Sequence, residues 1–295
     1  TSEEMLRNAD MALYRAKSDG GGVHHFFEKA MDHQAQKRRD MERDLRRAFA
    51  NGEFELHYQP LVDIASDCIS GFESLLRWHH PDKGMISPAE FIPVAEDIGL
   101  ISPLGEWVLR EACSEAVKWP TEIKVAVNLS PTQFRSRNLT QVVISALAQS
   151  GLSPRRLEPE ITDTLLLEKS SQVLATLHAL RALGVRISMD DFGTGYSSLS
   201  YLRSFPFDKI KIDRSFVKDL AQRPDCVAIV RAISGLGRSL NIKTTAEEVE
   251  TEDQLDWLRA EGCNALQGFL FSAARPVGEI EQLLAKFGQR ASRAA

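Results

Sequence analysis

Residues 185–199 read VRISMDDFGTGYSSL, and this stretch decides the fold. Its first five residues are rich in branched and apolar side chains, a composition that predicts a buried strand. Asp190 and Asp191 follow at the end of that strand, and a glycine-containing loop comes next. Adjacent carboxylates repel each other, and burying either one without a partner is costly. A divalent cation between them would remove this cost, whereas a surface Asp-Asp turn is the simpler alternative.

The same alternation of strand and helix extends through most of the chain. Predicted strands cover residues 54–62, 69–78, 123–129, 157–161, 185–189, 209–212, 242–245 and 265–270. Predicted helices cover residues 88–95, 104–119, 139–151, 171–183, 226–240 and 252–259. About eight strands alternating with helices predict an α/β protein with a (β/α)₈ barrel of the TIM type. An open doubly wound sheet is the alternative, but no glycine-rich dinucleotide loop opens the first unit.

The N-terminal part of the chain follows a different pattern. Residues 1–27 contain a predicted helix over 3–17 and a short predicted strand over 23–27, which is too little to bury a core. Residues 28–50 are highly charged, with Met41, Leu45, Ala48 and Phe49 at helical spacing. We therefore predict a fragment at 1–27, a helical linker at 28–43 and a barrel domain at 44–290.

Composition excludes several classes of function. The net charge of −5 provides no basic surface for a nucleic-acid backbone. The four cysteines show no paired spacing, which argues against zinc and favours reduced thiols in a cytosolic protein. His79 and His80 are adjacent and not spaced as a ligand pair. No apolar run is long enough to span a bilayer, so we expect a cytoplasmic chain, although a longer protein could carry a membrane sensor.

Polar residues stand at the ends of the predicted strands, where barrel active sites lie. These residues are Glu73, Arg77, Asn128, Glu160, Asp190, Asp191, Lys211, Asp213, Glu247 and Gln267. Carboxylate and amide oxygens, without a thiol or a well-placed imidazole, form the ligand set of Mg²⁺ or Mn²⁺. So many carboxylates would serve two cations more readily than one, with Asp190 or Asp191 as the bridge. Such sites suit in-line attack on a phosphoryl centre, and the planar fork of Arg77 could hold a phosphate oxygen.

These motifs resemble those of the EAL domain family over about residues 44–284. The matching segments are ESLLRW at 73–78, VNLS at 127–130, EITD at 160–163, the run 190–199, KID at 211–213, AEEVE at 246–250 and QGF at 267–269. The family has a modified (β/α)₈ barrel that hydrolyses cyclic di-GMP to linear pGpG, by in-line attack of a water activated by two Mg²⁺ or Mn²⁺ ions. Residues 9–17 resemble the last helix of a GGDEF (diguanylate cyclase) domain, but the signature loop of that family is absent, so the resemblance implies no cyclase activity here.

The resemblance also implies a role for each matching residue. The implied metal ligands are Glu73, Asn128, Glu160, Asp190, Asp191 and Glu247. The implied catalytic residues are Glu73, Asp191, Lys211, Glu247 and Gln267, with Lys211 orienting the attacking water. Gln59, Leu75, Arg77 and Asp213 would contact the substrate, and Asp163 would anchor the loop 190–199. A homodimer would form through the region after that loop, where Tyr196, Leu199, Tyr201 and Leu202 offer apolar side chains.

Three positions depart from the family pattern. Ser74 replaces an alanine, Asp163 replaces a glutamate that anchors the loop, and Glu248 replaces a glycine. Asp163 and Glu248 support the alternative of a cyclic di-GMP receptor without catalysis. A glycoside hydrolase barrel with two carboxylates is a third reading, and it needs neither Lys211 nor Asn128.

Overall fold

A computed structural model describes residues 2–18, 22, 24, 26, 29–136, 138–163, 165, 171–193, 202, 205–220 and 223–294. The chain divides into two compact units, one formed by residues 1–54 and 78–100 and the other by residues 55–77 and 101–295. Within the described residues, no helix combines the length and the apolar character needed to cross a membrane.

The first unit contains α1 (Ser2–Ser18), α2 (Lys29–Asn51), the end of β2 (Cys68–His80), β3 (Gly84–Ile86) and α3 (Pro88–Asp97). The helices α1 and α2 confirm the helices predicted over 3–17 and 28–50. In α1, however, Leu6 and Leu13 are exposed, and the small side chains of Ala12 and Ala16 are buried instead. The strand predicted over 23–27 lies mostly outside the described residues.

The helix α2 buries a stripe that includes a carboxylate as well as apolar side chains. Leu45 and Ala48 are buried as predicted, and Asp44 is buried beside them. The Asp44 carboxylate accepts hydrogen bonds from Lys83 Nζ at 2.8 Å and from His80 Nε2 at 3.2 Å. His80 therefore holds the β2–β3 hairpin to α2, which gives this buried histidine a structural role.

The second unit is a closed barrel. Its strands are β1 (Phe54–Asp63), β2, β4 (Lys124–Asn128), β5 (Leu157–Thr162), β6 (Ser188–Phe192), β7 (Lys209–Ile212), β8 (Lys243–Ala246) and β9 (Ala265–Leu266). The strand order is β1-β9-β8-β7-β6-β5-β4-β2, and a pairing between β1 and β2 closes the ring. Neighbours from β2 round to β9 are parallel, whereas β1 is antiparallel to β9. The predicted barrel is confirmed, with one reversed strand.

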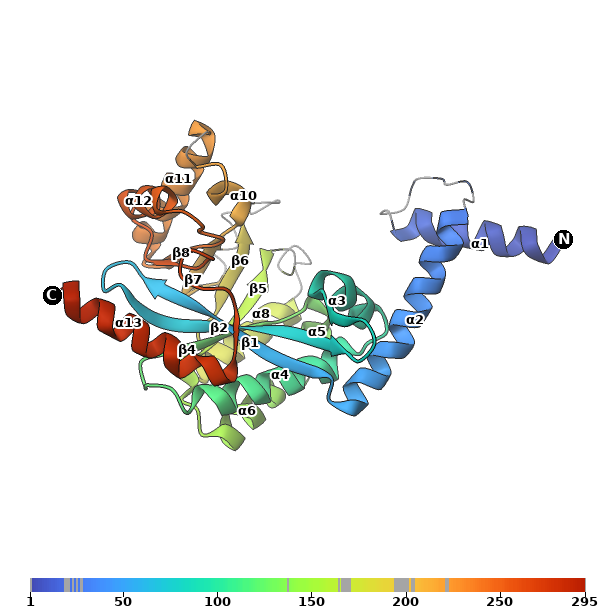
Figure 1. Ribbon diagram of the computed structural model, residues 1–295, viewed down its shortest axis with the longest axis horizontal. Helices are drawn as coiled ribbons and strands as arrows, with labels where there is room; N and C mark the ends of the chain where they lie inside the picture. The colour runs from blue at the N-terminus through green and yellow to red at the C-terminus, as the bar shows by residue number, and fades with distance from the viewer. Residues whose placement is uncertain are drawn as a thin grey trace. The chain divides into compact units, whose positions relative to one another are not determined.

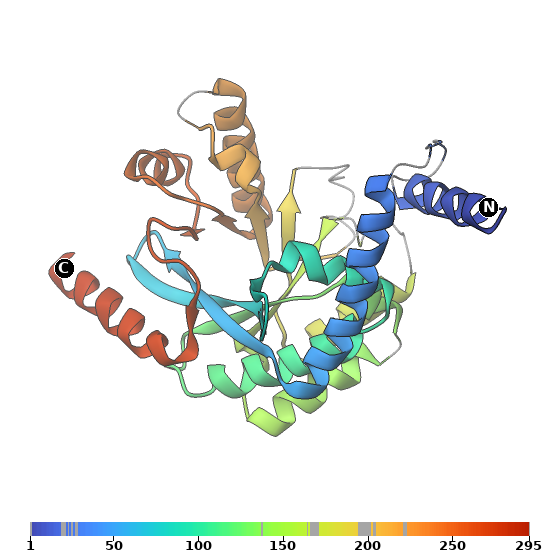
Figure 2. The ribbon, with the colours of Figure 1, turned by 45° about the vertical axis from the view of Figure 1, so that its right-hand side comes forward.

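Helices cover the outside of the strands in this unit (Figures 1 and 2). They are α4 (Ile101–Ala116), α5 (Pro131–Arg135), α6 (Leu139–Ser150), α8 (Ser171–Ala182), α10 (Arg214–Val217), α11 (Pro224–Leu240), α12 (Glu252–Ala260) and α13 (Ile280–Ala294), with short 3₁₀ turns η1 (Pro154–Arg156) and η2 (Val277–Glu279). The short strand β10 (Arg275–Pro276) pairs with β1. The main apolar core fills the space between helices and strands, because the outward faces of the strands carry residues such as Phe72, Val125 and Val127.

The predicted bounds of two strands, β6 and β9, were wrong. The strand β6 begins at Ser188 and not at Val185, because the preceding Ile187 N–H donates to the Asp208 side chain instead of to a strand neighbour. It also extends to Phe192, so Asp190 and Asp191 lie within an irregular strand end. The strand β9 stops at Leu266, after which Gly268 turns against Val249 so closely that a Cβ would lie 2.1 Å from its carbonyl oxygen.

Candidate active site at the mouth of the barrel

The carboxyl ends of the strands bring most of the predicted site residues into one connected group. The register places Asn128 beside Glu160, and the parallel strands deliver their last residues to the same mouth. Hydrogen bonds and ion pairs join Glu73 on β2, Asn128 on β4, Glu160 on β5, Asp190 on β6, Lys211 on β7, Glu247 after β8 and Gln267 after β9. The grouping expected from the sequence is therefore present in the fold.

Lys211 is the centre of this group. It is 1% exposed, and its Nζ lies 2.6 Å from Glu247, 2.7 Å from Glu160, 3.3 Å from Asp190 and 3.4 Å from Glu73. Burial disfavours its charge, but these four carboxylates outweigh that effect and hold the pKa of Lys211 well above its usual value. The side chain is therefore protonated at neutral pH and can orient a water molecule by donation, whereas it cannot accept a proton.

Glu73 accepts the largest number of hydrogen bonds in the group. Asn128 Nδ2 donates at 2.6 Å, Gln267 Nε2 at 2.6 Å and Lys211 Nζ at 3.4 Å. Burial works against the ionised form, but the charge of Lys211 and these donors outweigh it, so the pKa of Glu73 is lowered. Glu73 is thus fixed as a carboxylate whose oxygens point into the group.

The single positive charge of Lys211 does not balance the remaining carboxylates of the group. Burial, together with neighbouring Glu73 and Asp190, raises the pKa of Glu160 well above its usual value despite the opposing charge of Lys211. The same causes raise the pKa of Glu247 to about 8. In the described part of the chain, Glu160 Oε1 and Gln267 Oε1 are buried without a hydrogen-bond partner. One lysine among four carboxylates therefore leaves negative charge and oxygen lone pairs available for a cation.

Asp191 adds a strained carboxylate to the edge of this group. Its backbone has φ of 54°, a left-handed conformation that costs free energy in a residue other than glycine. Its N–H donates to Asp190 Oδ1 at 3.0 Å. Burial and the charge of Asp190 raise the pKa of Asp191, as the repulsion between adjacent carboxylates predicts. In this conformation the Asp191 carboxylate lies close to those of Asp190 and Glu247.

The donor set fits divalent cations. Oxygen atoms of Asp190, Asp191 and Glu247 lie within 4.8 Å of one another, which is a suitable span for ligands of one ion. Glu73, Asn128 and Glu160 supply further oxygen donors in the same group. These are hard ligands without sulfur, as Mg²⁺ and Mn²⁺ prefer.

The residues expected to contact a substrate surround this group. Gln59 Oε1 accepts a hydrogen bond from Gln267 Nε2 at 3.1 Å, so the two amides hold each other at the mouth. Arg77 and Leu75 are half-buried on β2, and burial lowers the pKa of the Arg77 guanidinium although Glu73 and Glu55 oppose that effect. Asp213 has a second task, because its Oδ1 accepts from Ser215 N at 2.9 Å and caps α10. Their contacts with a substrate stay predictions.

The loop after Asp191 can be followed only in part. Residues 194–201 lie outside the described residues, including Tyr196, Leu199 and Tyr201 of the predicted dimer surface. Leu202 is described and is 6% exposed, so it packs inside the protein and offers no apolar surface. Asp163, the expected anchor of the loop, is buried.

The comparisons with known proteins agree with the motifs. A model of the EAL domain matches residues 42–274. This chain belongs to the EAL domain family. The bifunctional diguanylate cyclase/cyclic di-GMP phosphodiesterase MucR of Pseudomonas aeruginosa is 45% identical over 97% of this chain and 42% of its own length. The cyclic di-GMP phosphodiesterase NbdA of the same species is 40% identical over 96% of this chain and 36% of its own length.

A solved structure has the same fold. It is described as PaMucR phosphodiesterase in a c-di-GMP complex, and it is 45% identical with a TM-score of 0.79, over 82% of this chain and 99% of that chain. The chain spans between 34% and 42% of the length of three curated relatives that it matches.

Two of the departures from the EAL pattern now have a structural description. Ser74 Oγ donates to the Ala126 carbonyl at 2.9 Å on the adjacent strand, so its hydroxyl is satisfied away from Glu73. Glu248 has φ of 49°, which explains why a glycine suits this position. Its carboxylate pairs with Arg214 at 3.1 Å, and both side chains are largely exposed. The pair directs the Glu248 charge toward solvent at the rim of the EAL barrel.

Replacing Glu248 by glycine is expected to change hydrolysis by less than about threefold, because water screens the charges of an exposed ion pair and such a pair contributes little. Steady-state measurement of kcat and KM with cyclic di-GMP checks this, with Arg214→Ala as the matched variant that breaks the same pair. An increase of tenfold or more in Glu248→Gly, without the same increase in Arg214→Ala, would show that Glu248 repels the substrate.

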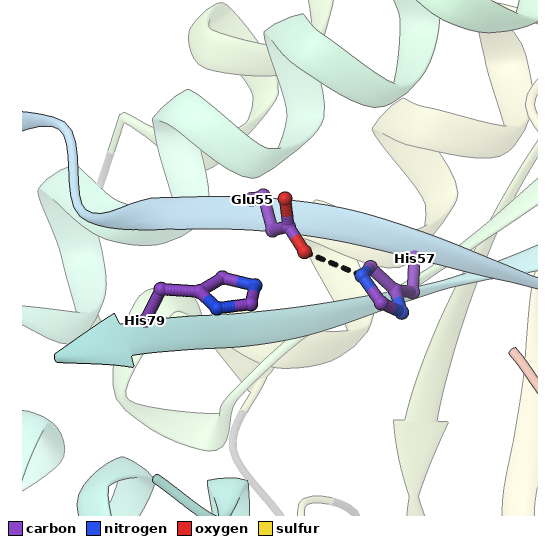
Figure 3. Close-up of side chains that lie close together, drawn as sticks. All are labelled: Glu55, His57 and His79. Carbon is purple, nitrogen blue, oxygen red and sulfur yellow. Dashed lines mark hydrogen bonds and ion pairs between the residues drawn. The ribbon is translucent and has the colours of Figure 1, made fainter. Parts of the chain in front are cut away.

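Sequence reasoning missed Arg214 and a second buried pair below the site. No sequence motif marks Arg214, because its role comes from the contact with Glu248. The sequence did contain a pattern that indicates the pair Lys209–Glu158. Residues 209 and 211 are both lysines, and residues 158 and 160 are both glutamates. Because alternate residues of a strand point to the same side, both members of each set point inward. A further pair, Glu55 and His57, lies two residues apart on β1 and is joined by a hydrogen bond (Figure 3).

Proposed function

We propose that this EAL domain hydrolyses cyclic di-GMP to linear pGpG. The carrying observation is the arrangement of four carboxylates around the buried Lys211, with a buried oxygen of Glu160 that has no hydrogen-bond partner among the described residues. Named phosphodiesterases among the relatives support the same activity. The two-carboxylate glycosidase is disfavoured, because such an enzyme has no need for this lysine or for Asn128.

The residues that would hold two divalent cations are Glu73, Asn128, Glu160, Asp190, Asp191 and Glu247. We infer Mg²⁺ or Mn²⁺ from their oxygen donors. When bound, the cations would neutralise charge on the phosphodiester and lower the pKa of a water molecule.

The side chains of the chain itself would position the reactants. Lys211 stays protonated and orients the attacking water through its N–H donors. Gln267 holds Glu73 and Gln59 in place, because its amide nitrogen donates to both. Arg77, at the neighbouring part of β2, would grip a phosphate oxygen with its planar fork.

A receptor that binds cyclic di-GMP without turnover is the second candidate. Asp163 favours it, because an aspartate is one methylene shorter than the glutamate that the EAL pattern has at this anchor. A looser loop would misplace Asp191, and a small misplacement can cost much of the rate.

We expect purified protein to release pGpG in Mg²⁺ or Mn²⁺ and to release none in excess chelator. Without metal ions, the carboxylates at the mouth lack the positive charge that neutralises them. Chromatography of the products measures this, with Ca²⁺ run in parallel. Tight binding of cyclic di-GMP in excess Mn²⁺ without pGpG would assign the domain to the receptor class.

Three broader features complete the proposal. We propose that α1 is the end of a GGDEF domain in a longer protein. We also propose that the site acts in the cytoplasm. Finally, we propose that the EAL domain forms a homodimer through the region after residue 193. Light scattering with and without cyclic di-GMP tests the dimer, and a monomer at all concentrations would contradict it.

A further inference from the structure

A second polar cluster lies at the opposite end of the barrel from the carboxylate mouth. Lys124, Lys209 and Lys243 are the first residues of β4, β7 and β8, and all three line a cavity of about 30 Å³. Glu158 of β5 and Thr245 of β8 line the same cavity. Because these strands are parallel, their first residues gather at the floor of the barrel.

The cavity exists because small residues stand where branched apolar side chains usually fill a TIM barrel. Gly71, Ala126 and Ala265 line it and leave its centre open. A side chain at position 71 would press on the Lys124 carbonyl, since a Cβ there would lie 3.1 Å from that oxygen. A space of this size holds about two water molecules or one small ion.

The charges around the cavity do not balance. Lys209 forms an ion pair with Glu158, and Lys124 Nζ lies at 4.0 Å from the other oxygen of that carboxylate. The second acid of the lining, Asp63, is engaged elsewhere, because its Oδ1 accepts from the N–H groups of Ala65 and Ser66 in the β1–β2 turn. The lining thus carries three lysines against two carboxylates, an excess of one positive charge.

Burial and neighbouring cations both act on Lys124. Burial lowers the pKa of its ammonium group, and Lys209, Arg186 and Lys243 lower it further, while Glu158 opposes them. A positive charge that is both desolvated and surrounded by like charges is stabilised by an anion.

Thr245 supplies an independent observation. Its side chain is fully buried, and its Oγ1 has no hydrogen-bond partner within the described residues. A buried hydroxyl without a partner costs free energy, so such groups usually mark a bound water or ion. Thr245 lines the same cavity as the three lysines, where this hydroxyl could donate to a ligand.

We propose that the floor of the barrel binds one small inorganic anion of the size of chloride. The Thr245 hydroxyl and the ammonium groups of Lys124 and Lys243 are its donors, and Glu158 stays paired with Lys209. The cavity is too small for a phosphate held with its full set of ligands, so the site is separate from any nucleotide chemistry at the mouth.

Bromide is the probe, because it replaces chloride and can be located by anomalous diffraction. We expect the Tm, measured in chelator at constant ionic strength with gluconate as the balancing anion, to rise by about 3 °C for each tenfold increase in bromide above its Kd. Lys124→Met and Thr245→Val are expected to remove this dependence. Lys286→Met, at an exposed position of α13, is the matched control and is expected to keep it.

The two variants also separate an anion from water. If water alone fills the cavity, bromide shifts the Tm of wild type and Lys124→Met equally, and no anomalous peak appears beside Thr245; either result overturns the proposal. If the cavity is empty, Thr245→Val raises the Tm in every salt, because the unpartnered hydroxyl is removed, and this result also overturns the proposal. A bromide peak beside Thr245, together with loss of the Tm response in both variants, supports it. None of these readouts depends on hydrolysis at the mouth.

Discussion

Glu73→Ala is expected to lower the rate of cyclic di-GMP hydrolysis by more than about 10³-fold, since metal binding supplies several kcal/mol and each 1.36 kcal/mol is a factor of ten in rate. The change removes one proposed metal ligand and the shared acceptor of Asn128, Gln267 and Lys211. Those three donors would then lack their fixed partner, so the geometry of the whole mouth would loosen.

Chromatographic detection of pGpG measures this loss. Glu73→Gln keeps the shape of the side chain and is expected to remain folded by circular dichroism while losing activity, because it lacks the negative charge. Glu106→Ala serves as the matched control, since Glu106 is a surface residue that pairs with Arg110 on α4. A Glu73→Ala protein that keeps a tenth of the wild-type rate would remove Glu73 from the catalytic group.

Lys211→Met is expected to have the largest effect on stability. In chelator, we expect the free energy of unfolding to fall by about 3–5 kcal/mol, because the buried carboxylates lose the ammonium group that neutralises them. That loss corresponds to a Tm lower by about 10 °C. Millimolar Mn²⁺ is expected to raise the Tm of this variant more than that of wild type, because the metal ions take over the neutralisation of Glu73, Glu160 and Glu247. Hydrolysis stays absent, since the donor that orients the water is gone.

The pH dependence gives this prediction a second test. Burial and like charges raise the folded-state pKa of Glu160 and Glu247 above that of the unfolded chain. Such groups contribute stability that is present at low pH and is lost as the pH rises through the folded pKa. Without Lys211 these pKa values rise further, so the metal-free variant should be more stable at pH 5 than at pH 8.

Calorimetry or circular dichroism at the two pH values measures the effect, with Lys286→Met as the control at an exposed lysine. If Lys211 served only the chemical step, Lys211→Met would match the wild-type Tm in chelator at both pH values.

The sequence predicted the barrel and the members of the mouth because local patterns encode both. Each strand carries its own apolar run, and each run ends on its own polar residue, so Glu160 or Lys211 can be recognised without knowing its neighbours. Less regular boundaries were harder to predict. The early end of β9 depends on how closely Gly268 approaches Val249, which is a contact between distant backbones.

Other features arise only when distant residues meet. Glu248 stands where the family has a glycine. Its carboxylate is directed toward solvent by the pair with Arg214, which lies 34 residues away in the sequence. Asp213 looked like a substrate contact, yet its side chain also caps α10. Neither partner belongs to the same motif, so no single stretch of sequence contained the information.

The sequence by itself determined the ligand chemistry of this protein: oxygen donors and one lysine at the ends of parallel strands, led by Asp190 and Asp191. Tertiary structure decided the charge balance among them. Lys211 and Glu73 are 138 residues apart, and only the closed barrel buries them together with Glu160 and Glu247. Because burial strengthens every charge interaction, that enclosure fixes which groups stay ionised, and it also creates the basic cavity at the opposite end of the same strands.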